Sequence, residues 1–221
     1  MPRGILTVVQ CWDDGVTADL RLTEILRRHG ASATFNLSAG LHERGRLRSF
    51  TYHGTEVTRL GWNEMREVYD GFTIASHSLT HPHLEQMPPE AARCEIAEGR
   101  ECLQQFFGQP VRGFAYPFGT YSDAVMNAVR EAGHLYARTA GSADDPFPPQ
   151  DPMAFHPTCH HLAPDFWARY ERAREGGVFY FWGHSYEMTT EAMWTAFEAT
   201  IAAISADPTA HWGDVAELFE H

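Results

Sequence analysis

Residues 71–81 have the sequence GFTIASHSLTH, in which a short apolar run leads directly into two histidines. The run up to Ala75 has the length and composition of a buried strand. His77 and His81 are four positions apart, so on a turn or helix start their rings lie on one face, one above the other. Imidazole is a common metal ligand, and this spacing therefore indicates two ligands of one ion.

A third ligand is expected at the end of an earlier strand. The largely apolar run of residues 5–12 ends abruptly in Asp-Asp-Gly at residues 13–15. A catalytic zinc ion needs three protein ligands and an open position for water. Asp14 is the candidate that would join His77 and His81, and the hypothesis that follows is a metal-dependent hydrolase.

Seven strand-like runs alternate with helical patterns, which is typical of a parallel α/β fold. The strands are expected at residues 5–12, 33–37, 72 to the His pair, 111–116, 135–139, 154–156 and 178–182. The helices are expected from residue 17 or 19 to 29, and at 61–69, 88–107, 122–133, 165–174 and 189 or 190 to 204. Residues 40–60 are expected to form a polar insertion with a mobile loop, and residues 207–221 a loop with one short helix.

Polar residues follow three of these strands. The aspartates of residues 13–15 follow the first strand, the His pair the third, and His184 the seventh. A β/α barrel gathers such residues at one face, whereas an open doubly wound sheet gathers them only near a switch point. The prediction is a single catalytic domain over residues 1–221 with a distorted parallel (β/α)7 barrel, similar to a TIM barrel.

Composition narrows the range of partners and chemistries. The net charge of −12 argues against nucleic-acid or anionic membrane surfaces as partners. All 17 basic residues are arginines, so Schiff-base lysines and P-loop lysines are excluded.

The four cysteines contain no Cys-x-x-Cys pair, and free thiols suit a reducing compartment. Residues 1–4 lead straight into a strand without a signal peptide, so a cytoplasmic location is expected.

Four motifs, in order, resemble those of the polysaccharide deacetylase family, the NodB-like carbohydrate esterases. The first two are WDDG at residues 12–15 and HSLTH at 77–81. The others are FAYPFG at 114–119, which is similar to the family's Pro-aromatic-Gly step, and FWGH at 181–184, which matches its last His. The resemblance covers roughly residues 5–205.

The resemblance implies a distorted β/α barrel and metal-dependent removal of N-acetyl groups from amino sugars. By the same resemblance the metal ligands are Asp14, His77 and His81. Asp13 would be the general base, His184 the general acid, and the backbone N–H of Phe118 would help to hold the oxyanion.

The chain departs from the family pattern at two motifs. Where many members place an Arg before the Pro-aromatic-Gly step, this chain has Ala115 and Tyr116. The fourth motif, an Asp-bearing stretch with Trp that tunes the catalytic His, has no evident counterpart. The candidates to replace it are Asp144, Asp145, Asp151 and Arg138.

Substrate contacts are expected from two groups of residues. The first group is an aromatic sugar platform formed by Trp12, Tyr116, Phe118 and Trp182, together with Pro117 as a further substrate-binding residue. The second is the cluster FHPTCHH at residues 155–161. This cluster is interpreted as a rim that contributes to substrate binding through His156 and His160, with a second metal site or a hydrogen-bonded loop as the alternatives.

The function expected from these residues is removal of N-acetyl groups from an amino sugar, oligosaccharide or polysaccharide by a metal-activated water. One alternative is hydrolysis of a non-sugar linear or cyclic amide, since an enzyme that acts on a cell-wall polymer would be expected to carry a signal peptide. Another is a catalytically weakened, glycan-binding relative. Zinc suits two histidines and one carboxylate, and cobalt, nickel or manganese are compatible with the same ligands.

Overall fold

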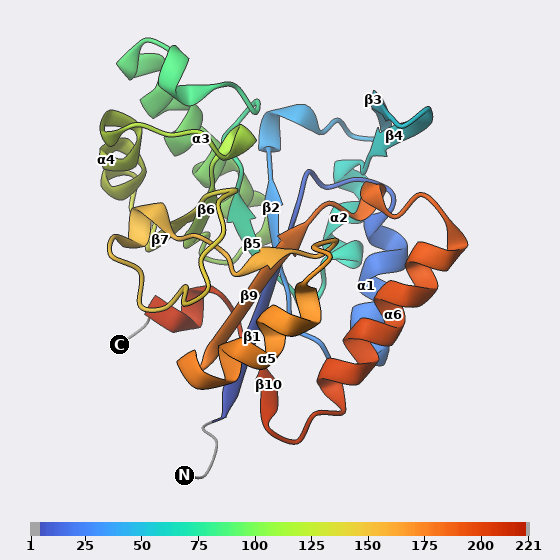
Figure 1. The fold of residues 1–221 in the computed structure, drawn as a ribbon. Helices are drawn as coiled ribbons and strands as arrows, with labels where there is room; N and C mark the ends of the chain where they lie inside the picture. The colour runs from blue at the N-terminus through green and yellow to red at the C-terminus, as the bar shows by residue number, and fades with distance from the viewer. Residues whose placement is uncertain (1–4, 220–221) are drawn as a thin grey trace.

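A curled parallel sheet forms the centre of the molecule, and helices cover its outer side (Figure 1). The computed structural model describes residues 5–219. Along the main path of the sheet the order is β7-β6-β5-β2-β1-β9-β8, and neighbouring strands pair in parallel. These strands are β1 (Leu6–Asp13), β2 (Thr34–Leu37), β5 (Thr73–Ser76), β6 (Gly113–Ala115), β7 (Tyr136–Arg138), β8 (Cys159–His160) and β9 (Val178–Gly183). The predicted distorted barrel is confirmed.

The sheet curls far enough for both of its edges to meet one segment, residues 155–160. Phe155 forms a parallel bridge with Arg138 of β7, and Cys159 pairs with Phe181 of β9. The sixth strand was expected at residues 154–156, but only a single bridge forms there and the strand lies at Cys159–His160. Pro157 explains the difference, because proline has no N–H to donate to a ladder.

Six α-helices connect the parallel strands within residues 5–219, and short 3₁₀ helices follow several strand ends. The α-helices are α1 (Asp19–Arg28), α2 (Trp62–Val68), α3 (Pro89–Phe107), α4 (Asp123–Glu131), α5 (Phe166–Gly176) and α6 (Glu191–Ser205). The 3₁₀ helices are η1 (Ala39–Leu41), η2 (Leu84–Gln86), η3 (Pro117–Gly119), η4 (Pro152–Ala154), η5 (Ser185–Glu187) and η6 (Ala216–Phe219). Ser122 and Thr190 cap α4 and α6 as predicted, by accepting hydrogen bonds from backbone N–H groups. None of the helices in this part of the chain is both long and apolar enough to cross a bilayer.

The insertion between β2 and α2 is an ordered hairpin, so the expected loop at residues 40–60 is wrong. Strands β3 (Leu47–Tyr52) and β4 (Thr55–Arg59) pair antiparallel. Most residues of β3 are exposed and several are polar, so the segment lacks the alternation of apolar and polar residues that identifies a strand. The hairpin is nevertheless fixed to the body by a backbone bridge between Val16 and Arg59.

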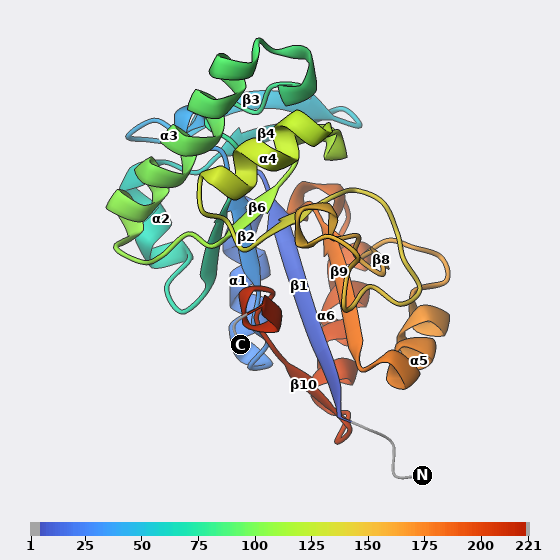
Figure 2. The ribbon, with the colours of Figure 1, turned by 90° about the vertical axis from the view of Figure 1, so that its left-hand side faces the viewer.

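An additional strand, β10 (Ala210–Trp212), lies where a loop was expected. It pairs in parallel with the start of β1, at Leu6–Val8, whereas β2 pairs with the end of β1, at Cys11–Asp13 (Figure 2). The short β2 leaves part of one edge of β1 unpaired, and β10 fills that part. Three residues are too short a run for a period-two pattern to stand out, which explains why the sequence did not predict it.

Side chains of β1 alternate between two sides of the sheet, as the period of two requires. Leu6, Val8 and Trp12 belong to the core between the sheet and the helices. Val9 and Cys11 belong to a separate cluster on the concave side, with aromatic side chains from other strands. Asp13 continues the concave set and is therefore directed to the inside of the curled sheet.

Candidate active site

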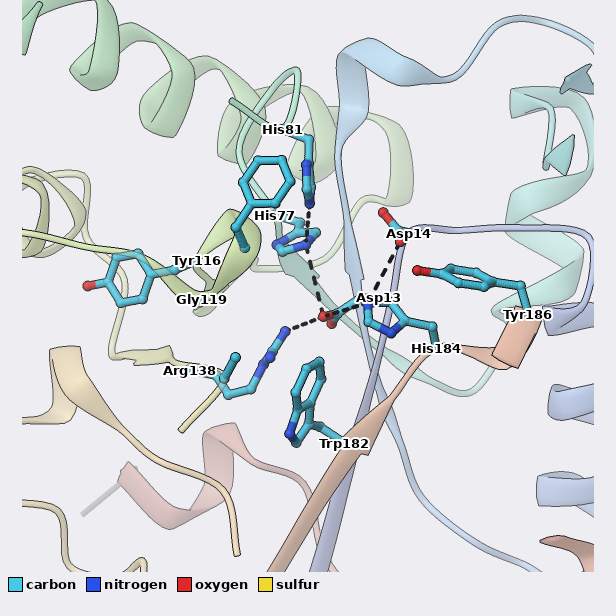
Figure 3. A pocket seen from close by; sticks show the side chains of 12 residues that line it. Asp13, Asp14, His77, His81, Tyr116, Gly119, Arg138, Trp182, His184 and Tyr186 are labelled. Atoms are coloured by element: carbon cyan, nitrogen blue, oxygen red, sulfur yellow. Dashed lines mark hydrogen bonds and ion pairs between the residues drawn. The ribbon is translucent and has the colours of Figure 1, made fainter. Parts of the chain in front are cut away.

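The predicted catalytic and metal-binding residues line a pocket at the carboxyl ends of the parallel strands (Figure 3). Its volume is about 280 Å³. The residues that line it are Asp13, Asp14, His77, His81, Tyr116, Phe118, Gly119, Arg138, Ala140, Trp182, His184 and Tyr186. Asp13 and Asp14 come from the end of β1, the His pair from the loop after β5, and His184 from the end of β9.

His77 is held in the tautomer that a metal ligand needs. Its Nδ1 lies 2.8 Å from the backbone oxygen of Ala115, and because a carbonyl can only accept, Nδ1 must carry the proton. The lone pair of the neutral ring is then on Nε2, which faces His81. Burial lowers the pKa of His77 to about 4 and also lowers the pKa of His81. Both rings are therefore expected to be neutral at pH 7.

The loop that carries the His pair is fixed to helix α3. Glu95 accepts hydrogen bonds from the backbone N–H groups of Leu79 and Thr80, at 3.1 and 2.8 Å. Gly99, one turn further along α3, lies against the backbone of Ser78, where a Cβ would come within 2.7 Å of the carbonyl carbon. A larger residue at position 99 would push the loop outwards, so this glycine sets the depth of the His pair.

Asp14, His77 and His81 form a cluster that can hold a metal ion. One ligand atom of each lies within 4.8 Å of the others. The two Nε2 atoms are 3.1 Å apart. Two nitrogen ligands at 2.0–2.1 Å from a tetrahedral zinc ion would be about 3.3–3.4 Å apart, so the spacing suits a single ion. Two neutral, lone-pair-bearing nitrogens and a carboxylate are also the donors that zinc prefers.

Asp13 lies beside this cluster and is fully engaged by other side chains. It accepts a hydrogen bond from the amide of Asn36, at 2.7 Å, and another from the guanidinium of Arg138. Burial by itself would raise the pKa of Asp13, but Arg138, His77 and His184 together lower it to about 2. Asp13 is therefore a carboxylate at any pH at which the protein is expected to work.

Arg138 is the member of the four replacement candidates that reaches the pocket. It comes from the end of β7, is buried, and its guanidinium also lies 4.4 Å from the ring centre of Trp182. Asp144 and Asp151 pair with arginines at the surface instead. Arg138 therefore orients Asp13 in this structure, whereas it was a candidate for the fourth motif, which tunes the catalytic His.

Glu187 is a site residue that the sequence analysis did not predict. Its Oε1 lies 3.2 Å from Nδ1 of His184, and its Oε2 accepts the backbone N–H of His184 at 3.0 Å. The Nε2 of His184 points the other way, 3.8 Å from Asp13 and 3.9 Å from Asp14. Burial lowers the pKa of His184, but Glu187 and the two aspartates raise it by more, so the net shift is upward.

The second histidine cluster is a hydrogen-bonded group around Glu187. Nε2 of His160 and Nε2 of His161 lie 2.9 and 3.0 Å from the same carboxylate oxygen. The backbone N–H of Leu162 donates to Nδ1 of His160, which places the proton of the neutral ring on Nε2. A protonated nitrogen cannot ligate a metal, so of the three interpretations the geometry favours the hydrogen-bonded loop.

The predicted substrate-binding residues are divided between the pocket and the core. Tyr116 and Trp182 line the pocket, although the Tyr116 hydroxyl donates to the backbone of Met153. Trp12 is fully buried on the outer side of β1 and packs against Phe197, which corrects the expectation that it binds substrate.

Three further predicted substrate-binding residues do not line the pocket. Pro117 is buried at the start of η3. His156 contacts the hydroxyl of Thr139, and His160 is engaged by Glu187. Phe118, by contrast, lines the pocket and is 55% exposed, with its ring stacked 3.9 Å from that of His83.

The family and its curated relatives support the resemblance seen in the sequence. The family model described as polysaccharide deacetylase matches residues 2–137, more than half of the chain. A chitooligosaccharide deacetylase of Azorhizobium caulinodans is 30% identical over 125 residues, which are 55% of this chain and 52% of that protein. The chain spans about half the length of the curated relatives it matches.

Solved structures share the fold at low sequence identity. A family 4 carbohydrate esterase from Streptomyces lividans superposes with a TM-score of 0.60 at 16% identity, over 94% of this chain and 91% of that one. The esterase domain of a multidomain xylanase from the hindgut metagenome of Trinervitermes trinervoides gives 0.61 at 17%, over 98% and 90%. A family 4 pseudoenzyme from Bacillus anthracis gives 0.63 at 16%, over 100% and 67%. With the family model and the four motifs in their expected order, the chain belongs to the polysaccharide deacetylase family.

Proposed function

We propose that this protein is a metal-dependent hydrolase that removes N-acetyl groups from an amino sugar or from an oligosaccharide or polysaccharide that contains one. The observation that carries the proposal is the convergence of Asp14, His77 and His81 beside the carboxylate of Asp13 and the imidazole of His184. The chitooligosaccharide deacetylase among the relatives supports the choice of substrate class.

Asp14, His77 and His81 would hold the metal ion in this proposal. When bound, a divalent cation supplies Lewis-acid chemistry, which lowers the pKa of water and polarises a carbonyl group. Zinc fits the donor set best, with cobalt, nickel and manganese as alternatives. The buried Nδ1–H contact of His77 would keep its Nε2 oriented toward the cation.

Asp13 is proposed as the general base that takes the proton from the attacking water. It is ionised because Arg138, His77 and His184 together outweigh the cost of burial. A carboxylate whose pKa is near 2 is a weak base, so transfer to Asp13 depends on a water whose own pKa has been lowered. Its contacts with Asn36 and Arg138 fix the carboxylate in place during the transfer.

His184 is proposed as the general acid that protonates the leaving amine. An amine leaves an acylated centre only when it is protonated, and this requires an acid whose pKa is near neutrality. Glu187 raises the pKa of His184 and lies beside its Nδ1, at 3.2 Å, while Nε2 faces the pocket. The backbone N–H of Phe118 is proposed to stabilise the oxyanion, and Trp182 and the exposed ring of Phe118 to contact the sugar.

Acetate release is the direct test of the proposed function. The protein is expected to release acetate from N-acetylglucosamine oligomers, to lose this activity in chelator, and to regain it when zinc is added. The variant Asp13→Asn serves as the control for background hydrolysis. Absence of metal-dependent release from every such oligomer would contradict the sugar assignment, and release only from N-acetylated non-sugar amines or cyclic amides would favour the alternative amide hydrolase.

Replacing Glu187 with glutamine is expected to move the alkaline limb of the kcat/KM profile to lower pH. The carboxylate raises the pKa of His184, so its removal lowers that pKa and depletes the protonated acid at a lower pH. We expect kcat/KM at pH 8 to fall roughly 10-fold, a part of the 10²–10⁴-fold that general acid catalysis contributes. A pH profile from 5 to 9 measures the effect.

The matched control is Glu191→Gln, four residues along the chain. Glu191 is exposed and pairs with Arg21 at the surface, so this variant removes the same charge away from the pocket. An unchanged alkaline limb in Glu187→Gln, or an equal displacement in both variants, would rule out Glu187 as the group that tunes His184.

A further inference from the structure

The two carboxylate oxygens of Asp14 face different partners. Oδ2 lies 3.9 Å from Nε2 of His184. Oδ1 lies 3.5 Å from a guanidinium nitrogen of Arg59. The same guanidinium donates a hydrogen bond to the backbone oxygen of Asp14. Arg59 therefore contacts both the side chain and the backbone of a residue that is proposed to bind the metal.

Arg59 is buried and comes from the end of the β3–β4 hairpin, 45 positions away from Asp14. Its third contact, from Nε to the hydroxyl of Ser49 at 3.1 Å, joins the guanidinium to the other strand of the hairpin. An arginine with three such partners has its planar fork fixed in one orientation. The hairpin thus places two guanidinium donors of Arg59, in a fixed orientation, beside the first turn after β1.

Asp14 needs such support because of its backbone conformation. Its φ is 85°, in the left-handed region that residues with a Cβ rarely adopt. The N–H of Asp14 donates to the backbone oxygen of Asn36 at 3.1 Å, and its carbonyl accepts from Arg59. With both backbone groups engaged, the peptide unit is held in this conformation and the side chain leaves β1 toward the His pair.

Tyr186 is a second group beside Asp14 that depends on the hairpin. Its hydroxyl points toward Asp14 in Figure 3, and burial, followed by the charge of Asp14, raises the pKa of the phenol. Phe50 and Tyr52 of β3 pack edge-on against the Tyr186 ring, each with ring centres 5.1 Å apart. Both neighbours of Asp14 on this side are therefore placed by β3 and β4.

We propose that Arg59 is a positioning residue for the metal site, which holds the carboxylate of Asp14 in the orientation in which it binds the cation. This inference rests on the metal site of the proposed function. Groups that hydrogen-bond a ligating carboxylate orient it, and their loss typically costs 10–100-fold in metal affinity. The positive charge of Arg59 opposes a nearby cation, so the proposal requires that orientation outweighs repulsion.

The backbone links of the hairpin do not involve the Arg59 side chain, which makes the residue testable. The N–H of Thr17 donates to Thr58, and the N–H of Leu60 donates to Gly15, at 2.8 and 3.0 Å. These bonds remain when the guanidinium is removed. Arg59→Met should therefore keep the hairpin in place and change only what reaches Asp14.

The experiment is calorimetric titration of zinc into metal-stripped protein, with thermal unfolding in chelator as a separate measure of the fold. Arg59→Met is expected to bind zinc at least about 10-fold more weakly than the parent protein, with Arg59→Lys between the two. Arg48→Met is the matched control, since Arg48 lies on the same hairpin and pairs with Glu56 at the surface. It is expected to bind zinc as the parent does.

Each result decides between the proposals. Unchanged or tighter zinc binding by Arg59→Met would overturn the positioning role, and so would a loss of affinity matched by an equal loss in Arg48→Met. If Arg59→Met does not fold, Arg59→Lys carries the test, and parent-like affinity in that variant with the same melting temperature in chelator would overturn the role. A parent protein that binds no zinc would instead overturn the proposed metal site itself.

Discussion

Replacing His77 with alanine is expected to abolish tight metal binding and to lower kcat/KM by at least about 10³-fold. A bound cation contributes several kcal/mol of charge stabilisation in the transition state, and each 1.36 kcal/mol is a factor of ten in rate. His77 is the most deeply buried of the three proposed ligands, and the Ala115 carbonyl fixes its tautomer. Alanine removes the ligating nitrogen, and its methyl group cannot hold a water molecule in place of that ligand.

Two measurements separate loss of the metal from loss of the fold. Metal content after dialysis against zinc reports binding, and thermal unfolding in chelator reports the stability of the metal-free protein. His81→Ala, at a less buried position, should give the same loss of metal with a smaller effect on the fold. His53→Ala is the control, because His53 is exposed in the turn of the β3–β4 hairpin. Retention of zinc and activity by both His77→Ala and His81→Ala would refute the assigned ligands.

Replacing Arg138 with methionine is expected to lower the free energy of unfolding by about 3–5 kcal/mol. Arg138 and Asp13 are both buried, with side chains 2% exposed. Removing one partner of such a pair leaves an uncompensated charge in the interior. Chemical denaturation at pH 7 in chelator measures the change without a contribution from metal binding.

The double variant Asp13→Asn/Arg138→Met tests whether the loss comes from the charge. It removes both charges and is expected to recover most of the stability, although it should be inactive. Arg130→Met is the matched control, since Arg130 pairs with Asp151 at the surface and such pairs contribute about 1 kcal/mol or less. A single variant as stable as this control would show that Asp13 does not depend on Arg138.

Arg138→Met should also change the pH dependence of activity. Burial raises the pKa of Asp13 and Arg138 opposes this, so without the guanidinium the pKa rises. The base is then lost at a higher pH, and the acidic limb of kcat/KM moves upwards. An acidic limb that stays in place in a folded Arg138→Met variant would mean that Asp13 is not the base.

The residues predicted from the sequence are those that local rules can locate. A strand that ends in Asp-Asp-Gly and another that ends in a His pair both direct polar groups to the carboxyl edge of a parallel sheet. The parallel topology follows from the alternation of strands and helices. From these features alone, the sequence predicts that five of the proposed residues lie at one site, namely Asp13, Asp14, His77, His81 and His184.

The residues that the sequence did not reveal, or could not single out among several candidates, depend on contacts between distant segments or on irregular backbone. Arg138 and Asp13 are 125 positions apart, and only the curling of the sheet brings β7 opposite β1. Glu187 reaches His184 across a 3₁₀ turn, which no apolar period marks. The β3–β4 hairpin is polar on most of its surface and so resembles a loop, although its last residue, Arg59, is buried beside Asp14.

The pairing of β1 also has a consequence for biosynthesis. One flank of this strand is completed by β9 and part of the other by β10, both of which leave the ribosome long after β1. Until residue 212 emerges, the nascent segment that carries the aspartates has open hydrogen-bonding edges, which are templates for self-association. We therefore expect truncations that end before β9 to form inclusion bodies or to need a chaperone, even though they contain most of the proposed catalytic residues.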